Sequence, residues 1–227
     1  MSRAGYLWGY PERPRSREGE PMQTSTAPRT ESARSKRTAI VAAAVDRFGS
    51  DGYEHTKWAS IADDVGIGQT ALYHYFESKA HCLLTIMRLE LTQSLERFQE
   101  VTGSTEDPAQ ALVQAVRSAY DGSARDALQR RILQNHLDLL STARPSEKEE
   151  QERQRSRALV RDIEKAWTDL IRRGVDSGAF ADRDVELSAR MALALVVGVW
   201  RWYRPGGPHT LEEIGVLTSD TVLRVVV

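Results

Sequence analysis

Residues 36–82 read KRTAIVAAAVDRFGSDGYEHTKWASIADDVGIGQTALYHYFESKAHC, and this stretch decides the fold of the N-terminal part of the chain. Apolar residues at helical spacing predict a first helix that stops near Gly49 and a second helix that follows Thr56. The two glycines at residues 66–68 end the second helix and allow a tight turn. A short third helix is predicted over residues 69–76.

One face of the third helix is too polar and too aromatic to lie wholly in a core. Leu72 and Phe76 fall on the side that packs against the second helix. The opposite side carries residues that hydrogen-bond to base edges or to phosphate oxygens: Gln69, Thr70, Tyr73 and His74. A short helix of this kind, after a helix and a tight turn, is typical of a helix-turn-helix. The sequence therefore predicts double-stranded DNA as a partner.

Further groups near this face are predicted to meet phosphates. Thr56 is the expected N-cap of the second helix, where free N–H groups favour an anion. Lys57 opposes the dipole of that helix at a cost of roughly 0.3–1 kcal/mol, which a phosphate would offset. The alternative for Lys57 is an ordinary solvated lysine. Lys79 follows Ser78, the expected cap of the next helix, and is predicted to be free to pair with a phosphate.

Residues 1–37 form a basic arm on a mildly acidic body. They carry eight basic and four acidic residues, a charge of +4, so a net charge of −1 leaves −5 for the remainder. A basic arm suits a polyanionic partner, and we add Lys36 and Arg37 at its end to the predicted DNA contacts. Residues 1–34 are rich in Pro, Arg and Ser without apolar periodicity, which predicts disorder.

The rest of the chain shows helical periodicity with recognisable ends, and no credible run of alternating strand residues. Helices are expected to begin at Asp107-Pro108, near Ala124, at Ser146, at Asp184 and at Thr210. The predicted fold is all-α with about nine helices. Residues 35–82 are assigned to a three-helix DNA-binding domain, and residues 83–227 to a helical domain for ligand binding and dimerisation.

Composition narrows the class of protein. Hydrophobic residues make up 41% and charged residues 28%, an ordinary balance for a globular chain. The longest apolar run, residues 191–200, is about half of a membrane span, so no membrane partner is expected. Cys82 is the only cysteine and excludes an intrachain disulfide. With no apolar leader, these features predict a cytoplasmic protein.

The stretch at residues 36–82 resembles the DNA-binding domain of TetR-type bacterial repressors. The matching residues keep their order and spacing without a gap: Phe48, Gly52-Tyr53, Thr56, Ile61-Ala62, Gly66-Ile67, Leu72-Tyr73, Tyr75-Phe76 and Ser78-Lys79. The resemblance implies DNA contacts from seven positions: Thr56, Gln69, Thr70, Tyr73, His74, Tyr75 and Lys79. Lys57, Gly68 and Thr70 depart from the usual family residues, and these departures leave the expected fold intact.

The same resemblance implies a ligand cavity among the middle helices and a dimer formed by the last two. Residues 193–200 are apolar all round, which independently favours a homodimer. The residues predicted to line the cavity are Met87, Phe98, Tyr120, Ile132, His136 and Trp167, with ordinary core packing as the alternative for each. The segment WRWYRPGG at residues 200–207 is similar to a TetR subgroup that answers to acyl-CoA thioesters in lipid or steroid breakdown. The alternative for this segment is a dimer-interface motif.

The expected function is a regulator released from a palindromic operator by a small hydrophobic or acyl-CoA-type effector. One alternative is a DNA-binding regulator without a small-molecule ligand, and a remote one is a helical enzyme acting on a thioester. The five histidines show no metal-binding spacing, and the sequence has neither a glycine-rich phosphate loop nor a nucleophile elbow. We therefore predict no catalytic residue, no metal site and no cofactor.

Overall fold

The computed structural model describes residues 27–227 and confirms the all-α prediction. This part of the chain contains nine α-helices and two short 3-10 helices, and no strand. The helices are α1 (Ala27–Ser50), α2 (Trp58–Val65), α3 (Gln69–Tyr75), α4 (Lys79–Gly103), α5 (Pro108–Ser118), α6 (Ala124–Asn135), η1 (Leu137–Leu140), α7 (Glu147–Asp176), α8 (Val185–Gly198), η2 (Val199–Arg201) and α9 (Leu211–Val226). None of them is both long enough and apolar enough to cross a membrane.

The first helix begins earlier than the sequence predicted. Residues 27–34 were expected to be disordered, but they form the first two turns of α1. The segment has no glycine, and Pro28 stands in the first turn, where a missing N–H breaks no helical hydrogen bond. The prediction of disorder for residues 27–34 is therefore wrong, and its remainder, residues 1–26, lies outside the described residues.

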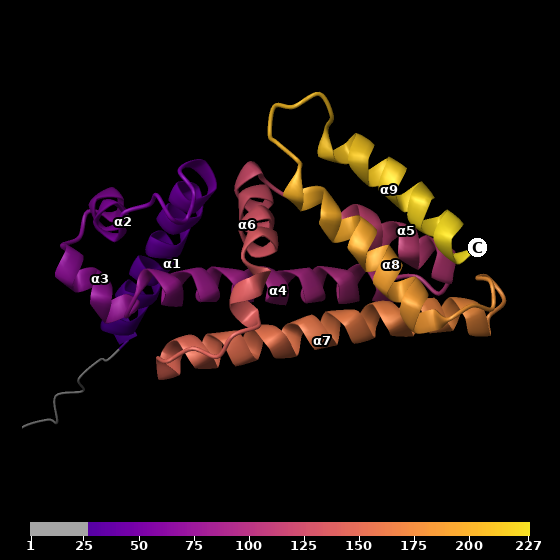
Figure 1. Cartoon of the computed structure of the whole chain (residues 1–227), viewed down its shortest axis with the longest axis horizontal. Coiled ribbons are helices and arrows are strands. Elements are labelled where there is room, and N and C mark those ends of the chain that lie inside the picture. The colour runs from indigo at the N-terminus through magenta and orange to yellow at the C-terminus, as the bar shows by residue number, and fades with distance from the viewer. Residues whose placement is uncertain (1–26) are drawn as a thin grey trace, which may run out of the picture.

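Helices α1 to α3 gather at one end of an elongated molecule (Figure 1). Their core includes the first half of α4, whose buried residues from Cys82 to Leu91 belong to the same apolar cluster. The predicted border at residue 82 therefore falls inside one continuous helix. Figure 1 shows α4 and α7 running side by side along the molecule, and the Ser78 hydroxyl donates to Glu149 Oε1 at 2.5 Å where the two helices begin.

A second apolar core lies at the other end, where α5, α8 and α9 pack over α4 and α7. Helix α6 stands between the two ends, in contact with α1 on one side and with η2 on the other (Figure 1). The helix predicted to begin near Ala124 ends at Asn135, where the His136 ring Nδ1 pairs with the Ile132 carbonyl at 2.8 Å. The backbone then tightens into the 3-10 helix η1.

The local end signals were mostly correct. Ser78, Asp107, Ser146, Asp184 and Thr210 each accept a backbone N–H at the start of the predicted helix. Each such contact satisfies a donor that the first helical turn would otherwise leave without a partner.

Gly174 in α7 leaves room for Phe180, which is buried in the second core. A Cβ at position 174 would lie 1.9 Å from Phe180 Cδ2 and 2.2 Å from Cε2. We predict that Gly174→Ala lowers the free energy of unfolding by about 1–3 kcal/mol, because the ring has to shift within a packed core. Thermal denaturation measures the loss.

Gly103→Ala, at the end of α4, is the matched control for Gly174→Ala. No atom lies within 4 Å of the added Cβ at position 103. This variant should be as stable as the parent chain or slightly more stable. An equal melting temperature for the two variants would contradict the predicted clash.

Candidate DNA-binding surface and effector cavity

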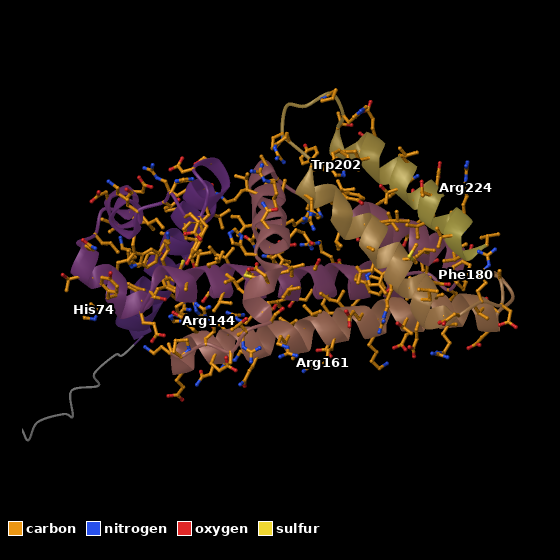
Figure 2. All side chains as sticks on the ribbon, viewed as in Figure 1. His74, Arg144, Arg161, Phe180, Trp202 and Arg224 are labelled. Atoms are coloured by element: carbon orange, nitrogen blue, oxygen red, sulfur yellow. The ribbon has the colours of Figure 1, made fainter. Side chains whose placement is uncertain are left out.

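The outward face of α3 carries the four residues that the sequence placed there. Gln69, Thr70, Tyr73 and His74 are all exposed, whereas Leu72 and Phe76 are fully buried. Gly66 adopts the left-handed conformation at φ 67°, which turns the chain from α2 into α3 without strain. Figure 2 shows His74 at the extreme end of the molecule, pointing away from the other helices. Tyr75 lies at the edge of this face and is half-buried.

Thr56 does not cap α2, so that prediction is wrong. Its side chain is only 4% exposed, and its hydroxyl donates to Gly52 O at 2.8 Å. The Thr56 N–H also donates to Gly52 O, at 3.1 Å. Both donors of Thr56 are therefore used to close the loop after α1, and neither is available to a phosphate. The N-cap position of α2 belongs to Lys57, whose side chain is exposed and makes no capping hydrogen bond.

Lys79 is not free, contrary to the sequence prediction. Its ammonium donates to Tyr53 O at 2.7 Å and to Thr56 O at 3.1 Å, and it lies 4.3 Å from the centre of the Tyr53 ring. These contacts satisfy carbonyl groups of the loop between α1 and α2. Lys79 therefore fixes this loop against the start of α4 and has little left for DNA.

The two cations at the end of the basic arm lie on α1 and are half-buried. The Arg37 guanidinium stacks over the Phe76 ring, with Cζ 4.5 Å from the ring centre. Such a cation–π contact fixes the side chain beside the end of α3. Lys36 precedes it on the same helix.

His81 lies in the first turn of α4 and is 5% exposed. Its ring packs edge-on against Phe76, and its Nδ1 accepts the Glu77 N–H at 3.3 Å. Burial lowers the pKa of His81, and the charges of Glu77, Arg37, Glu152 and Lys148 act on it in addition. The histidine is therefore held neutral at the junction of α3 and α4.

The His81 environment predicts a loss of stability in mild acid. Because the folded pKa lies below the unfolded value of about 6.5, the unfolded chain binds more protons between the two values. The stabilisation is complete above pH 6.5 and is lost as the pH falls through the folded pKa. His81→Asn keeps an acceptor and cannot be protonated there, so its melting temperature should fall less between pH 7 and pH 5. An identical fall in both proteins would contradict this assignment.

A cavity of about 230 Å³ lies between the two ends of the molecule. Helices α4, α5, α6, α7 and α8 all contribute to its wall, together with η1 and η2. Its apolar lining residues are Leu91, Phe98, Ala115, Ala119, Leu133, Leu137, Val160, Ile163, Trp167, Leu193, Val196, Val197 and Trp200. Its polar lining residues are Glu90, Ser94, Arg97, Ser118, Arg130, Gln134 and Glu164.

Three charged residues of this wall are linked to one another. Glu90 Oε1 accepts from Arg97 Nη2 at 3.0 Å and from Arg130 Nε at 3.3 Å. The Arg130 guanidinium also lies over the Trp200 ring, with Cζ 5.2 Å from its centre. Burial raises the pKa of Glu90, and the two arginines oppose that shift. The cavity is thus apolar over most of its wall and charged at one end.

Comparisons with known proteins agree with this architecture. Residues 40–86 match the family of bacterial regulatory proteins described as the tetR family. Residues 105–226, more than half of the chain, match the family described as tetracyclin repressor-like, C-terminal domain. This chain belongs to the TetR family. It is a DNA-binding transcriptional repressor of that family and not an enzyme.

Individual relatives of this TetR-family chain are also described as transcriptional regulators. The HTH-type transcriptional repressor KstR2 of Mycobacterium tuberculosis is 30% identical over 183 residues, which cover 80% of this chain and 88% of KstR2. The structure of PfmR, a TetR-family regulator from Thermus thermophilus, matches with a TM-score of 0.71 at 28% identity over 82% of this chain and 97% of PfmR.

AibR, solved in complex with isovaleryl coenzyme A and operator DNA, matches with a TM-score of 0.67 at 20% identity. The match covers 82% of this chain and 97% of AibR. At that identity the likeness shows the fold alone.

Two of the six cavity residues predicted for the TetR-family effector line the cavity. Phe98 and Trp167 form one part of its wall and pack against each other, with ring centres 5.2 Å apart. The other four do not line it: Met87, Tyr120, Ile132 and His136. Met87 and Ile132 are buried in the core of the DNA-binding end, because that core extends along α4 and α6.

Tyr120 and His136, the polar residues among the six predicted to line the cavity, make contacts outside it. The Tyr120 hydroxyl donates to Val196 O at 2.9 Å and so joins α5 to α8. The His136 ring packs edge-on against Tyr53 at 5.4 Å, beside the loop between α1 and α2. The sequence interpretation missed Glu90, Arg97 and Arg130. A charged residue within the apolar stripe of α4, as at Glu90, was the available signal.

Helices α8 and α9 carry apolar side chains that no other part of residues 27–227 covers. On α8, Leu187, Met191 and Leu195 follow one another at intervals of four residues and are 58%, 51% and 37% exposed. On α9, Val216 and Leu217 are also exposed. We call these five residues the apolar face of α8 and α9. An exposed apolar surface of this kind marks an interaction site more often than a solvated one.

Proposed function

We propose that this TetR-family repressor binds a palindromic operator as a homodimer and is released when a small molecule fills the cavity. The proposed DNA contacts are Gln69, Thr70, Tyr73 and His74 on α3, together with Lys57 at the start of α2. We propose further contacts from Tyr75 at the edge of this face, from Arg37 beside the end of α3 and from Lys36, which precedes Arg37 on α1. Because its target is chromosomal DNA, we place the protein in the bacterial cytoplasm.

The observation that carries the proposal is the position of α6. Arg130 and Leu133 of this helix line the cavity. Leu128, on the same helix, packs against α1, where a Cβ at Gly49 would lie 2.9 Å from its Cδ2. A ligand that displaces α6 therefore moves a helix that the DNA-binding end rests on, and this supports a coupling between the two sites.

A second contact supports the same coupling. The Arg125 guanidinium on α6 donates to Asp46 of α1 through two bonds, from Nε at 2.9 Å and from Nη2 at 2.6 Å. This ion pair is exposed and stabilises the fold little. Its two parallel bonds nevertheless fix the direction in which α6 meets α1.

The apolar face of α8 and α9 supports the dimer. A symmetric pair would bury this face twice and would carry two α3 helices. Two recognition helices match half-sites roughly one helical turn of DNA apart, which is why we expect a palindromic operator.

For the effector we favour a small hydrophobic molecule or an acyl-CoA thioester. AibR shares the fold and was solved with isovaleryl coenzyme A, and KstR2 is described as a ketosteroid transcriptional regulator. The cavity suits the acyl end of such a ligand, because its wall is mostly apolar and about 230 Å³ does not hold a whole coenzyme A. The segment at residues 200–207 begins at the cavity with Trp200 and continues with the exposed Arg201 and Arg204.

A fluorescence-polarisation titration tests the release. The full chain is bound to labelled DNA from upstream of its own gene, and isovaleryl-CoA, longer acyl-CoA thioesters or free coenzyme A is added. We expect a thioester to release the DNA and free coenzyme A to leave it bound. Ala119→Trp, which fills the cavity from its wall, should weaken DNA binding without any ligand. If neither the thioesters nor the filled cavity changes DNA binding, the proposed release mechanism is wrong.

A further inference from the structure

The charged end of the cavity contains two buried groups whose hydrogen-bonding capacity is not filled. Glu90 is 2% exposed and Arg130 is 4% exposed, and both line the cavity. Glu90 Oε1 accepts two hydrogen bonds, but Glu90 Oε2 has no partner among the described residues. The same holds for Arg130 Nη1, since this guanidinium reaches Glu90 through Nε. Each of these two lining residues thus carries one buried polar atom without a partner, an acceptor on Glu90 and a donor on Arg130.

Such groups are rare in folded proteins, because a buried polar atom without a partner has lost its hydration and gained nothing in return. The surrounding contacts hold both in place. Arg130 is fixed between Glu90 and the Trp200 ring, and Glu90 is also held by Arg97 from the next turns of α4. Neither group can turn away without breaking an ion pair. Because both residues line the cavity, we expect a molecule bound there to reach both atoms.

The free acceptor decides which class of molecule fits. An anion would be attracted by Arg97 and Arg130, but it would bring no donor to Glu90 Oε2 and would be repelled by the Glu90 carboxylate. A hydrocarbon would leave both atoms without partners. A hydroxyl or an amide supplies a donor and an acceptor without charge.

We propose that the cavity selects an effector with a compact apolar body and an uncharged hydroxyl or amide group, which donates to Glu90 Oε2 and accepts from Arg130 Nη1. The inference rests on the proposed function, because it takes the cavity to be the effector site. The apolar body contacts the part of the wall formed by Phe98 and Trp167. The polar group contacts Glu90 on α4 and Arg130 on α6.

Three probes with the same ring test the selectivity: benzamide, benzoate and toluene. Their binding to the full chain without DNA is measured at pH 7.5 by ligand-observed NMR titration. We expect benzamide to bind roughly tenfold more tightly than either of the others, since only benzamide completes a hydrogen bond to a charged group without adding charge. Tighter binding of benzoate, or equal binding of toluene, would overturn the proposal.

Glu90→Gln should reverse the preference. The variant keeps the size of the side chain and removes its negative charge, so that Arg97 and Arg130 face the cavity without a counterion. Benzoate should then bind more tightly than benzamide. Glu164→Gln is the matched control, because Glu164 lines the same cavity but is exposed. It should change the ratio of the two affinities by less than about twofold.

Arg130→Gln gives a second variant that removes the free donor and leaves Glu90 in place. Its preference for benzamide over toluene should fall to about twofold or less. Circular dichroism melts establish that each variant is folded. An unchanged order of affinities in a folded Glu90→Gln or Arg130→Gln protein contradicts the proposal, and so does an absence of benzamide binding to the parent chain.

Operator release is measured separately from probe binding. Selective benzamide binding without any ligand-induced release would contradict the proposed function and leave the assignment of the polar site intact. Release by a thioester from a chain that shows no amide selectivity would contradict the assignment of the polar site and leave the proposed function intact.

Discussion

A Gln69→Ala/Tyr73→Ala double variant is expected to bind its operator about 100-fold more weakly than the parent chain. Both side chains lie on the exposed face of α3 and contribute nothing to the core beneath it. A bidentate contact from glutamine to adenine carries about 1–3 kcal/mol of discrimination, and Tyr73 adds a phosphate contact. The loss should be larger for the operator than for random DNA, because Gln69 is the residue that we propose to read bases.

The same double variant should keep its stability within about 0.5 kcal/mol, because exposed substitutions away from caps and cores change little. Arg172→Ala/Asp176→Ala, at the far end of α7, is the matched control, since both residues are exposed and distant from α3. Polarisation titrations measure the operator affinity of the parent chain, the double variant and the control, and thermal melts measure their stability. A folded double variant with the operator affinity of the control would contradict the assignment of α3.

Leu187→Glu/Met191→Glu is expected to turn the dimer into a monomer. Both side chains are more than half exposed in the single chain, so the change should not damage the fold of the subunit. In a symmetric dimer it would bury four carboxylates without partners, and an uncompensated buried charge costs about 3–5 kcal/mol. We expect the dimer dissociation constant to rise at least ~1000-fold.

Loss of the dimer should also lower operator affinity by a comparable factor, because a monomer reads only one half-site. Gln110→Glu/Gln114→Glu on α5 is the matched control, since it adds the same charges at the same spacing on an exposed helix face. Sedimentation velocity at several concentrations measures the masses. If the α8 variant remains a dimer, the apolar face of α8 and α9 is not the dimer interface.

The sequence was most informative where the cause of a structure is local. Helical periodicity separated Leu72 and Phe76 from the four exposed residues of α3, and the structure shows the same division. The caps at Ser78, Asp107 and Thr210 were predictable because a cap bonds to an N–H only two or three residues away.

The errors at Thr56 and Lys79 have a common cause. Both side chains bond to carbonyl groups of the loop between α1 and α2, and Lys79 is more than twenty residues away from these carbonyls in sequence. The residue types indicated a hydroxyl group and a cation near the DNA. They could not indicate that carbonyl groups of the folded loop would accept the hydrogen bonds of both side chains. The contacts of Lys79 are tertiary, whereas Thr56 bonds to a carbonyl only four residues back, in a turn that the sequence interpretation did not foresee.

The cavity was the least predictable feature for a similar reason. Glu90 and Arg130 are forty residues apart and meet only because α6 crosses α4. Met87 and Phe98 look alike in the sequence, since both are apolar residues on the buried stripe of α4. Only the packing of the neighbouring helices places Phe98 at the cavity and Met87 in the core of the DNA-binding end.

The central claim is that the outward face of α3 reads a specific duplex. The most direct measurement is a polarisation titration of the full chain against its own upstream DNA and a scrambled fragment of equal length, at 50 and 200 mM salt. The account predicts tight binding to the upstream fragment, weaker binding to the scrambled one, and a fall in both affinities with salt. Equal affinities for the two fragments at both salt concentrations would contradict it.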